Sequence, residues 1–181
     1  GIRGKFNDKL TSSLAKKVGY ALGNTLIKEG SIVIGHDTRV SSKILLEAIS
    51  SGLNSANKNV VDIGICPTPA IQFLVKKFNF SCGIMITASH NPPEYNGIKI
   101  FDENGKKLNK SKEKVLEQKI NLIKNTNILK RLKNKNAQRF DLLETYENSL
   151  ISSTGTENLE GLKIILDTCH GSATICAEKI F

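Results

Sequence analysis

Residues 31–54 are SIVIGHDTRVSSKILLEAISSGLN, and this stretch decides the fold. Its first part, Ser31–Gly35, is a short run rich in β-branched residues without polar alternation, which predicts a strand buried on both faces. In Ser41–Asn54 the apolar residues recur at helical spacing, which predicts an amphipathic helix. A buried strand followed closely by an amphipathic helix is typical of α/β proteins built on a parallel sheet.

The same alternation of strands and helices continues along the chain. We predict further strands at Val60–Ile63, Cys82–Thr87 and Gly97–Phe101, and a strand-connecting turn at Asn96-Gly97. We predict further helices at Leu10–Ile27, Pro69–Phe78, Lys110–Ile123 and Ala137–Ser152. The expected fold class is therefore α/β, with a layered α/β/α domain over residues 1–152 and a mixed, mostly parallel sheet.

The composition changes after this first domain. Ser152–Asn158 (SSTGTEN) is small and polar, so we expect a linker at residues 153–158. Beyond it, Leu162–Asp167 predicts a strand and Gly171–Phe181 predicts the beginning of a helix. One strand and one helix are too little for a domain, so we expect residues 159–181 to be the incomplete start of a second, similar domain.

Length and composition exclude several classes of protein. The chain has 181 residues, of which 39% are hydrophobic and 24% charged, as in an ordinary globular protein. No apolar run approaches the roughly 20 residues that a membrane helix needs, and no signal-peptide pattern opens the sequence. The four cysteines form no CxxC pair, which favours free thiols in a reducing compartment. We therefore expect a cytoplasmic protein with no membrane partner.

The net charge of +9 comes from one segment. Lys106–Arg139 holds twelve basic residues against two acidic ones, so this segment alone carries +10. Such a block is found in nucleic-acid binders and also on solvated, lysine-rich helix faces. No aromatic residue lies between Phe101 and Phe140, although base stacking would use one. We expect the helix face and no nucleic-acid partner.

The densest polar cluster, Thr87–Pro92 (TASHNP), directly follows a predicted strand. Loops at the carboxyl ends of strands hold the reactive groups of many α/β proteins. Ser89 is a candidate nucleophile and His90 its candidate partner, although a turn that uses Ser and Asn only for capping is an alternative. The GxSxG motif of serine hydrolases is absent.

Basic residues lie in the other polar clusters. Lys99 either returns toward the Ser89 loop or is a solvated surface lysine. Asp37 and Arg39 either pair structurally or arrange an anion site, and Arg3 stands between two glycines that permit close approach of a phosphate. Basic groups around a hydroxyl favour phosphoryl transfer over ester hydrolysis, because phosphoryl transfer depends mainly on positioning and charge stabilisation.

Five motifs occur in a fixed order along the chain. They are GIRG at Gly1–Gly4, GHDTR at Gly35–Arg39, PTPA at Pro67–Ala70, TASHNPPEYNGIKI at Thr87–Ile100 and DTCHGSA at Asp167–Ala173. Through them the chain resembles the N-terminal part of the α-D-phosphohexomutases, which include phosphomannomutase/phosphoglucomutase and phosphoglucosamine mutase. The resemblance covers essentially the whole chain.

The resemblance implies a catalytic role for the Ser89 loop. Ser89 would be carried as a phosphoserine and would exchange phosphate with a hexose phosphate (glucose, mannose or glucosamine) through a bisphosphorylated sugar, moving phosphate between O1 and O6. Arg3 and Lys99 would lie beside the transferring phosphoryl group, as acid/base or charge-stabilising groups. His90 and Asn91 would hold the phosphoserine.

The resemblance also implies Mg²⁺ as cofactor, with the phosphate on Ser89 as one ligand. With Asn91, Arg39 completes our set of candidate substrate- or phosphate-binding residues. The acidic DGDxDR-type loop that supplies the family's three metal aspartates is absent from these 181 residues.

The sugar-selecting loop and the last phosphate-binding loop of the family are absent as well. We therefore expect the chain alone to be inactive, and the alternative hypothesis is a non-catalytic module that binds sugar phosphate. TASHN, in place of SASHN, favours the phosphomannomutase/phosphoglucomutase members over the glucosamine type. The sequence leaves the oligomeric state open.

Overall fold

The computed structural model describes residues 2–123, 137–155 and 159–181. Gly1 of the first motif, residues 124–136 of the basic segment and residues 156–158 of the predicted linker lie outside the described residues. Within the described ranges, six strands form one sheet in the order β1-β5-β4-β2-β3-β6. The strands are β1 (Ile2–Lys5), β2 (Ser31–His36), β3 (Asn59–Ile65), β4 (Cys82–Ile86), β5 (Tyr95–Phe101) and β6 (Gln138–Arg139).

The sheet is mixed, as the sequence predicts. The neighbouring strands β4, β2, β3 and β6 run parallel to one another, whereas β5 is antiparallel to both β4 and β1. Both faces of the central strand are buried, because Ile32 and Ile34 of β2 pack on one side and Val33 packs on the other. Burial on both faces explains why the central strands show no polar alternation.

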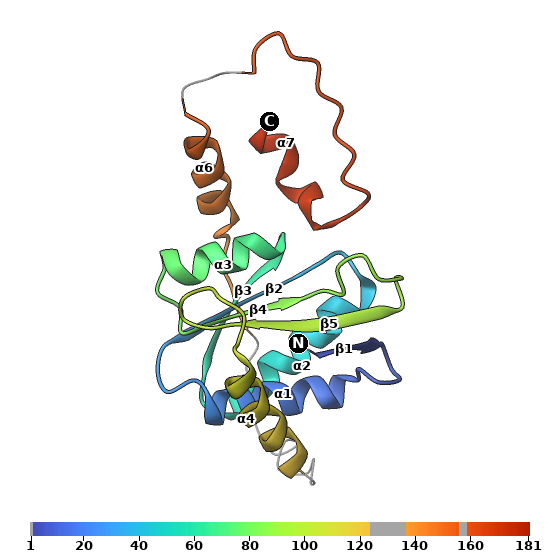
Figure 1. Ribbon diagram of the computed structural model, residues 1–181, viewed down its shortest axis with the longest axis vertical. Helices are drawn as coiled ribbons and strands as arrows, with labels where there is room; N and C mark the ends of the chain where they lie inside the picture. Colours follow the sequence, from blue (N-terminus) through green and yellow to red (C-terminus); the bar gives the residue numbers. More distant parts are fainter. Residues whose placement is uncertain (1, 124–136, 156–158) are drawn as a thin grey trace.

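Helices cover both faces of the sheet, which confirms the α/β/α layering (Figure 1). Helices α1 (Ser12–Thr25), α2 (Val40–Ser55) and α4 (Lys110–Leu122) pack on one face, and α3 (Thr68–Lys77) packs on the other. Polar caps fix two of the helix starts: the Thr11 side chain accepts a hydrogen bond from the Leu14 N–H, and the Asn109 side chain accepts one from the Lys112 N–H.

The N-terminal motif forms a strand that the sequence analysis missed. Ile2–Lys5 is β1, and it pairs with β5 so that Arg3 lies opposite Gly97. The predicted turn at Asn96-Gly97 is wrong, because both residues lie inside β5. Glycine is needed there for close approach: a Cβ on Gly97 would lie 2.7 Å from the Thr87 carbonyl oxygen and 3.0 Å from that of Ile2.

The predicted helix at Ala137–Ser152 is shorter than expected. Gln138–Arg139 forms β6 beside β3, and the helix α6 occupies Leu143–Ser153. Helix α6 packs on α3, where the ring centroids of Phe73 and Tyr146 are 5.8 Å apart.

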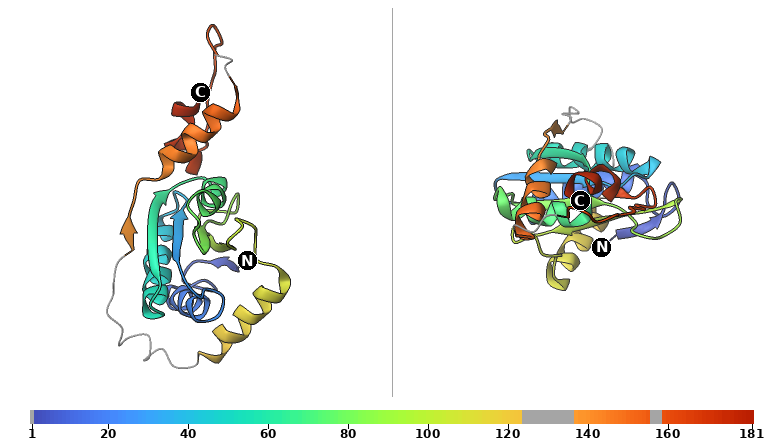
Figure 2. Two further views of the ribbon diagram at one scale, coloured as in Figure 1. Left: turned by 90° about the vertical axis from the view of Figure 1, so that its left-hand side faces the viewer. Right: turned by 90° about the horizontal axis from the view of Figure 1, so that it is seen from above.

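The C-terminal residues lie with α6 at one end of the molecule (Figure 1, Figure 2). The strand predicted at Leu162–Asp167 is absent: these residues are exposed, Ile165 almost fully, and pair with no strand of the described chain. Without a neighbouring strand, the N–H and C=O groups of a β-strand have no partners. The predicted C-terminal helix is a 3₁₀ turn, η1 (Ser172–Ile175), followed by the short α7 (Ala177–Ile180). Among the described residues, no helix is long and apolar enough to cross a membrane.

Candidate active site

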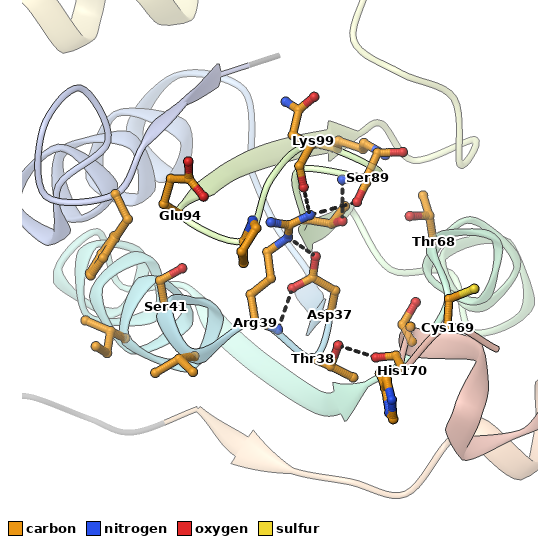
Figure 3. A pocket seen from close by; sticks show the side chains of 18 residues that line it. Asp37, Thr38, Arg39, Ser41, Thr68, Ser89, Glu94, Lys99, Cys169 and His170 are labelled. Carbon is orange, nitrogen blue, oxygen red and sulfur yellow. Dashed lines mark hydrogen bonds and ion pairs between the residues drawn. The ribbon is translucent and has the colours of Figure 1, made fainter.

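The carboxyl ends of the parallel strands β2 and β4 open into one pocket (Figure 3). Its volume is about 740 Å³, which suits a small-molecule ligand. The loop after β2, the β4–β5 loop and the C-terminal loop at residues 169–172 all contribute to its walls. The pocket lining includes Asp37, Thr38, Arg39, Ser41, Thr68, Ser89, Asn91, Glu94, Lys99 and His170.

Ser89 lies at the start of the β4–β5 loop and is exposed to solvent. Its backbone is left-handed, with φ of 59°, a conformation that costs a non-glycine residue about 1–2 kcal/mol. Two local bonds hold this turn: the Ser89 N–H donates to the Thr87 hydroxyl at 2.9 Å, and the Asn91 N–H donates to the Ala88 carbonyl at 3.2 Å. The strained turn presents the Ser89 hydroxyl to the pocket, as expected of a functional loop.

His90 is exposed beside Ser89. Its Nδ1 lies 3.3 Å from the Ser89 Oγ, which is long for a bond with a hydroxyl. The two side chains can therefore approach one another although they are neighbours in the sequence. The contact alone does not make a hydrolase triad, because a triad also needs a carboxylate that orients the imidazole.

Lys99 and Arg3 lie on one face of the sheet, on the neighbouring strands β5 and β1. Arg3 of β1 lies opposite Gly97, and Lys99 is two residues further along β5, so Arg3 and Lys99 are diagonal neighbours across the two strands. Gly97 has no side chain that could separate them. Lys99 also lines the pocket that Ser89 lines (Figure 3). The structure thus places Ser89 and Lys99 in the lining of one pocket, with Lys99 partly exposed to solvent.

The surroundings of Lys99 lower the pKa of its ammonium from the ordinary value of 10.5. Partial burial is the largest cause, and the positive charges of Lys107 and Arg3 add to it, whereas the carboxylate of Asp37 acts in the opposite direction. Arg3, Lys99 and Lys107 also line a second, smaller cavity of about 360 Å³ under α4. This second cavity is also lined by Glu113 and Glu117 and not by Ser89, so Lys99 is the cation that lines both cavities.

Arg39 binds the loop itself. Its Nε donates to Asp37 at 3.0 Å, Nη1 donates to the carbonyls of Pro92 and Tyr95, and Nη2 donates to those of Ser89 and Asn91. A guanidinium has five N–H donors, and all five are used. Of the two alternatives for Asp37 and Arg39, the structure shows the structural pair, and it leaves Arg39 no donor for the substrate phosphate that the sequence analysis assigned to it.

A buried polar network beneath the loop was not predicted. The Asn96 amide donates to the hydroxyls of Ser41 and Ser42, at 2.8 and 2.9 Å, and the Ser42 hydroxyl donates to Asp37 at 2.6 Å. Asn96 and Ser42 are fully buried. The only sequence signal was their polarity inside elements with apolar neighbours, and the Asn-Gly pair concealed it by resembling a turn.

The C-terminal loop closes another side of the pocket. The Thr38 hydroxyl donates to the His170 carbonyl at 2.8 Å, and Cys169 and His170 lie across the pocket from Lys99 and Ser89 (Figure 3). Both residues of this loop have a left-handed backbone, with φ of 49° and 53°. In the sequence these two residues stood out only as part of the last motif, and neither was predicted to belong to the site.

The described residues do not form a metal site by themselves. Nowhere in the described ranges do three or more His, Cys, Asp or Glu side chains gather closely enough to hold a metal ion. The described part of the chain therefore offers a cation no cage of such side chains.

The described residues thus form a layered α/β/α domain in which a left-handed serine and a lysine line the same pocket. Residues 1–127 match the family model described as phosphoglucomutase/phosphomannomutase, alpha/beta/alpha domain I, and the chain belongs to this family. The resemblance seen in the motifs is thereby confirmed.

Curated relatives and solved structures agree with this assignment. The chain is 58% identical to a phosphoglucosamine mutase of Prochlorococcus marinus strain MIT 9215 and 39% identical to one of Synechococcus sp. strain CC9311. Both matches cover the whole chain and 40% of the relative, so the chain spans less than half the length of these proteins. A phosphoglucomutase/phosphomannomutase family protein of Burkholderia thailandensis superimposes with a TM-score of 0.80 at 25% identity, over 98% of this chain and 39% of that one.

Proposed function

We propose that the chain is the phosphoserine-bearing part of a phosphohexomutase that acts on glucosamine phosphate. The observation that carries the proposal is the exposed Ser89, held with φ of 59° at the mouth of a pocket that Lys99 also lines. The substrate follows the relatives, which are named phosphoglucosamine mutases over the full length of this chain. The TASHN motif, with Thr87 in place of serine, favoured the phosphomannomutase/phosphoglucomutase members. We give the relatives' names more weight than this one residue.

In the proposed reaction, phosphate passes from Ser89 to the free hydroxyl of the sugar phosphate. The bond between phosphorus and the Ser89 Oγ breaks, a bond between phosphorus and the sugar oxygen forms, and the sugar is then bisphosphorylated. The phosphate at the other end of the sugar returns to Ser89 in the second half of the reaction. The net result is a shift of phosphate between O6 and O1.

Lys99 and Arg3 have different parts in this proposal. The lowered pKa of Lys99 increases the fraction of neutral amine, so Lys99 can accept the proton of the attacking sugar hydroxyl and return it in the second half. The Arg3 guanidinium stabilises the negative charge of the transferring phosphoryl group. His90 and Asn91 hold the phosphate between transfers.

We further propose Mg²⁺ as cofactor, a cytoplasmic location and a division of the chain into three segments. Mg²⁺ is included as the ion that the family resemblance implies, and no step is assigned to it. A cytoplasmic location agrees with four free cysteines, and we propose no nucleic-acid or membrane partner. We also propose that residues 1–152 form the domain that carries Ser89, that 153–158 are a linker, and that 159–181 begin a second domain.

The test is the mutase activity of Ser89→Ala in the protein as its gene encodes it, with glucosamine 6-phosphate as substrate. We expect activity to fall by about three orders of magnitude or more, because the group that forms the covalent intermediate is removed. Ser153→Ala, at the end of α6 and outside the pocket, is the matched control and keeps its activity.

Activity that survives Ser89→Ala would contradict the mechanism. Sugar-phosphate binding by the wild-type protein without any turnover would instead support the non-catalytic module.

A further inference from the structure

We infer that Arg39 is a positioning residue for phosphoryl transfer: it clamps the β4–β5 loop so that Ser89 stays in its left-handed conformation. The inference rests on the proposed function, because it assigns Arg39 an effect on the reaction through Ser89. It replaces the predicted role of Arg39 as a phosphate contact.

Backbone carbonyls from along the β4–β5 loop all bind the guanidinium of Arg39. Its two terminal nitrogens donate hydrogen bonds to four backbone carbonyls, spread from Ser89 to Tyr95, at 2.6–3.0 Å. Four carbonyl dipoles that point at one place repel one another unless a cation lies between them. The planar fork of a guanidinium can satisfy all four, whereas the single ammonium of a lysine has three donors and a different geometry. The loop conformation therefore depends on an arginine at this position.

Arg39 is itself fixed from below. Asp37 accepts from both the Nε and the backbone N–H of Arg39, and its other contact is the hydroxyl of the buried Ser42. Asn96 joins Ser42 to β5, and its own Oδ1 accepts the Gly97 N–H at 2.8 Å. The network thus connects the end of β2, the start of α2 and the start of β5, which are three rigid elements.

The effect of Arg39 on chemistry must be indirect. Arg39 contacts the carbonyl oxygen of Ser89 and not its hydroxyl, and all five of its donors are used by the loop and Asp37. A left-handed serine persists only where its surroundings determine it, so loss of the clamp lets Ser89 relax toward an ordinary backbone conformation. A displacement of about 1 Å of a reacting group costs about 100-fold in rate.

The experiment compares Arg39→Lys and Arg39→Ala with Arg139→Met in the protein as its gene encodes it. Arg139 also pairs with an aspartate, Asp62, but it is largely exposed and lies outside the pocket, so it is the matched control. We expect kcat to fall about 100-fold in both Arg39 variants, with little change in KM for glucosamine 6-phosphate. We expect Arg139→Met to behave as wild type.

Two further readouts separate positioning from general loss of structure. Added guanidinium ion, below denaturing concentration, fills the vacated place in Arg39→Ala and restores part of its kcat, but it does not rescue Ser89→Ala. The amides of Asn91 and Tyr95 donate hydrogen bonds to carbonyls inside the loop. We expect their hydrogen-exchange rates to rise in the Arg39 variants and to stay at the wild-type value in Arg139→Met. If an Arg39 variant does not fold, Ser42→Ala, which removes the hydroxyl that donates to Asp37 and accepts from Asn96 while leaving Arg39 in place, answers the same questions.

Two results would overturn the inference. A raised KM with unchanged kcat would make Arg39 a substrate contact, and wild-type kcat in Arg39→Lys with unchanged loop exchange would remove the clamp altogether. If the wild-type protein has no mutase activity, the proposed function fails, but the exchange of the Asn91 and Tyr95 amides still shows whether Arg39 holds the loop.

Discussion

Two aspartate–arginine pairs differ in almost everything except residue type: Asp37 and Arg39 lie in the loop between β2 and α2, whereas Asp62 and Arg139 lie on the paired strands β3 and β6. Asp37 and Arg39 are 3.0 Å apart with side chains only 10% and 12% exposed, and they belong to a network that reaches the Ser89 loop. Asp62 and Arg139 are 3.5 Å apart with side chains 21% and 59% exposed, at the edge formed by β3 and β6.

The difference teaches that burial and further partners decide what an ion pair does. An exposed pair gains little, because water screens the charges and long side chains lose entropy when they are fixed. A buried pair contributes little net stability when it is intact, but it leaves an uncompensated charge when one partner is removed. We therefore expect the protein to tolerate changes at Arg139 and to respond strongly to changes around Arg39.

The largest expected effect follows removal of the carboxylates. Asp37→Asn lowers the free energy of unfolding by about 3 kcal/mol, because the Arg39 guanidinium loses its buried counter-charge. Asp62→Asn lowers it by about 0.5 kcal/mol, because its partner is exposed. Chemical denaturation of both variants measures the difference. Equal losses would mean that the two pairs are equivalent and would contradict the comparison.

A smaller effect is expected at the glycine near each aspartate–arginine pair, which is Gly97 for Asp37–Arg39 and Gly64 for Asp62–Arg139. Gly97→Ala lowers stability by about 2 kcal/mol, because its Cβ would press on two backbone carbonyls that cannot move aside. At Gly64, with φ of 69°, the three atoms nearest to a Cβ would all belong to the Arg139 side chain, which can swing into solvent. Gly64→Ala therefore costs about 1 kcal/mol of backbone strain. Thermal unfolding of the two variants tests this order, which a larger loss at Gly64 would reverse.

The smallest effect concerns the pH dependence of stability. Because the pKa of Lys99 is lowered in the folded state, the folded protein binds fewer protons than the unfolded chain between that pKa and 10.5. The contribution of Lys99 to the free energy of unfolding consequently rises as the pH increases through this window. Below the window, the penalty for its partly buried charge is fully present. In Lys99→Met this contribution disappears, which denaturation at neutral pH and near 10.5 would show as a flatter dependence.

The same titration sharpens the comparison of the two aspartates. Asp37 is the group that raises the pKa of Lys99, so Asp37→Asn moves this pKa further down, whereas Asp62→Asn leaves it unchanged. Titration of Lys99 by NMR with labelled lysine detects the shift. An equal response to both substitutions would show that Lys99 does not sense Asp37.

The sequence predicts the parts of the site that depend on local pattern. Ser89 stands out because a polar cluster follows a buried strand, and Lys99 stands out as a charge in the next strand. The clamp could not be predicted, because Arg39 binds backbone carbonyls some fifty residues away, and every residue has such a carbonyl. Asn96 was misplaced because Asn-Gly favours turns in general, whereas here the absence of a side chain on Gly97 leaves room for the carbonyl oxygens of Ile2 and Thr87.

The fold shows the same division between local and distant causes. Helices and buried strands were located from periodicity and composition, which are local. The strands β1 and β6 are stabilised by pairing with distant neighbours, β5 and β3, and they carry no strong pattern of their own. The exposed Leu162–Asp167 is the opposite case, because it has the composition of a strand and no strand beside it among the described residues.

The most direct test of the account is the intact mass of the protein before and after it meets a hexose phosphate. We expect a fraction of the protein to be heavier by one phosphate, localised to Ser89, and this phosphate to disappear as a bisphosphorylated sugar is formed from stoichiometric glucosamine 6-phosphate. A protein that carries no phosphate on Ser89, or whose phosphate stays in place when the sugar phosphate is added, would contradict it.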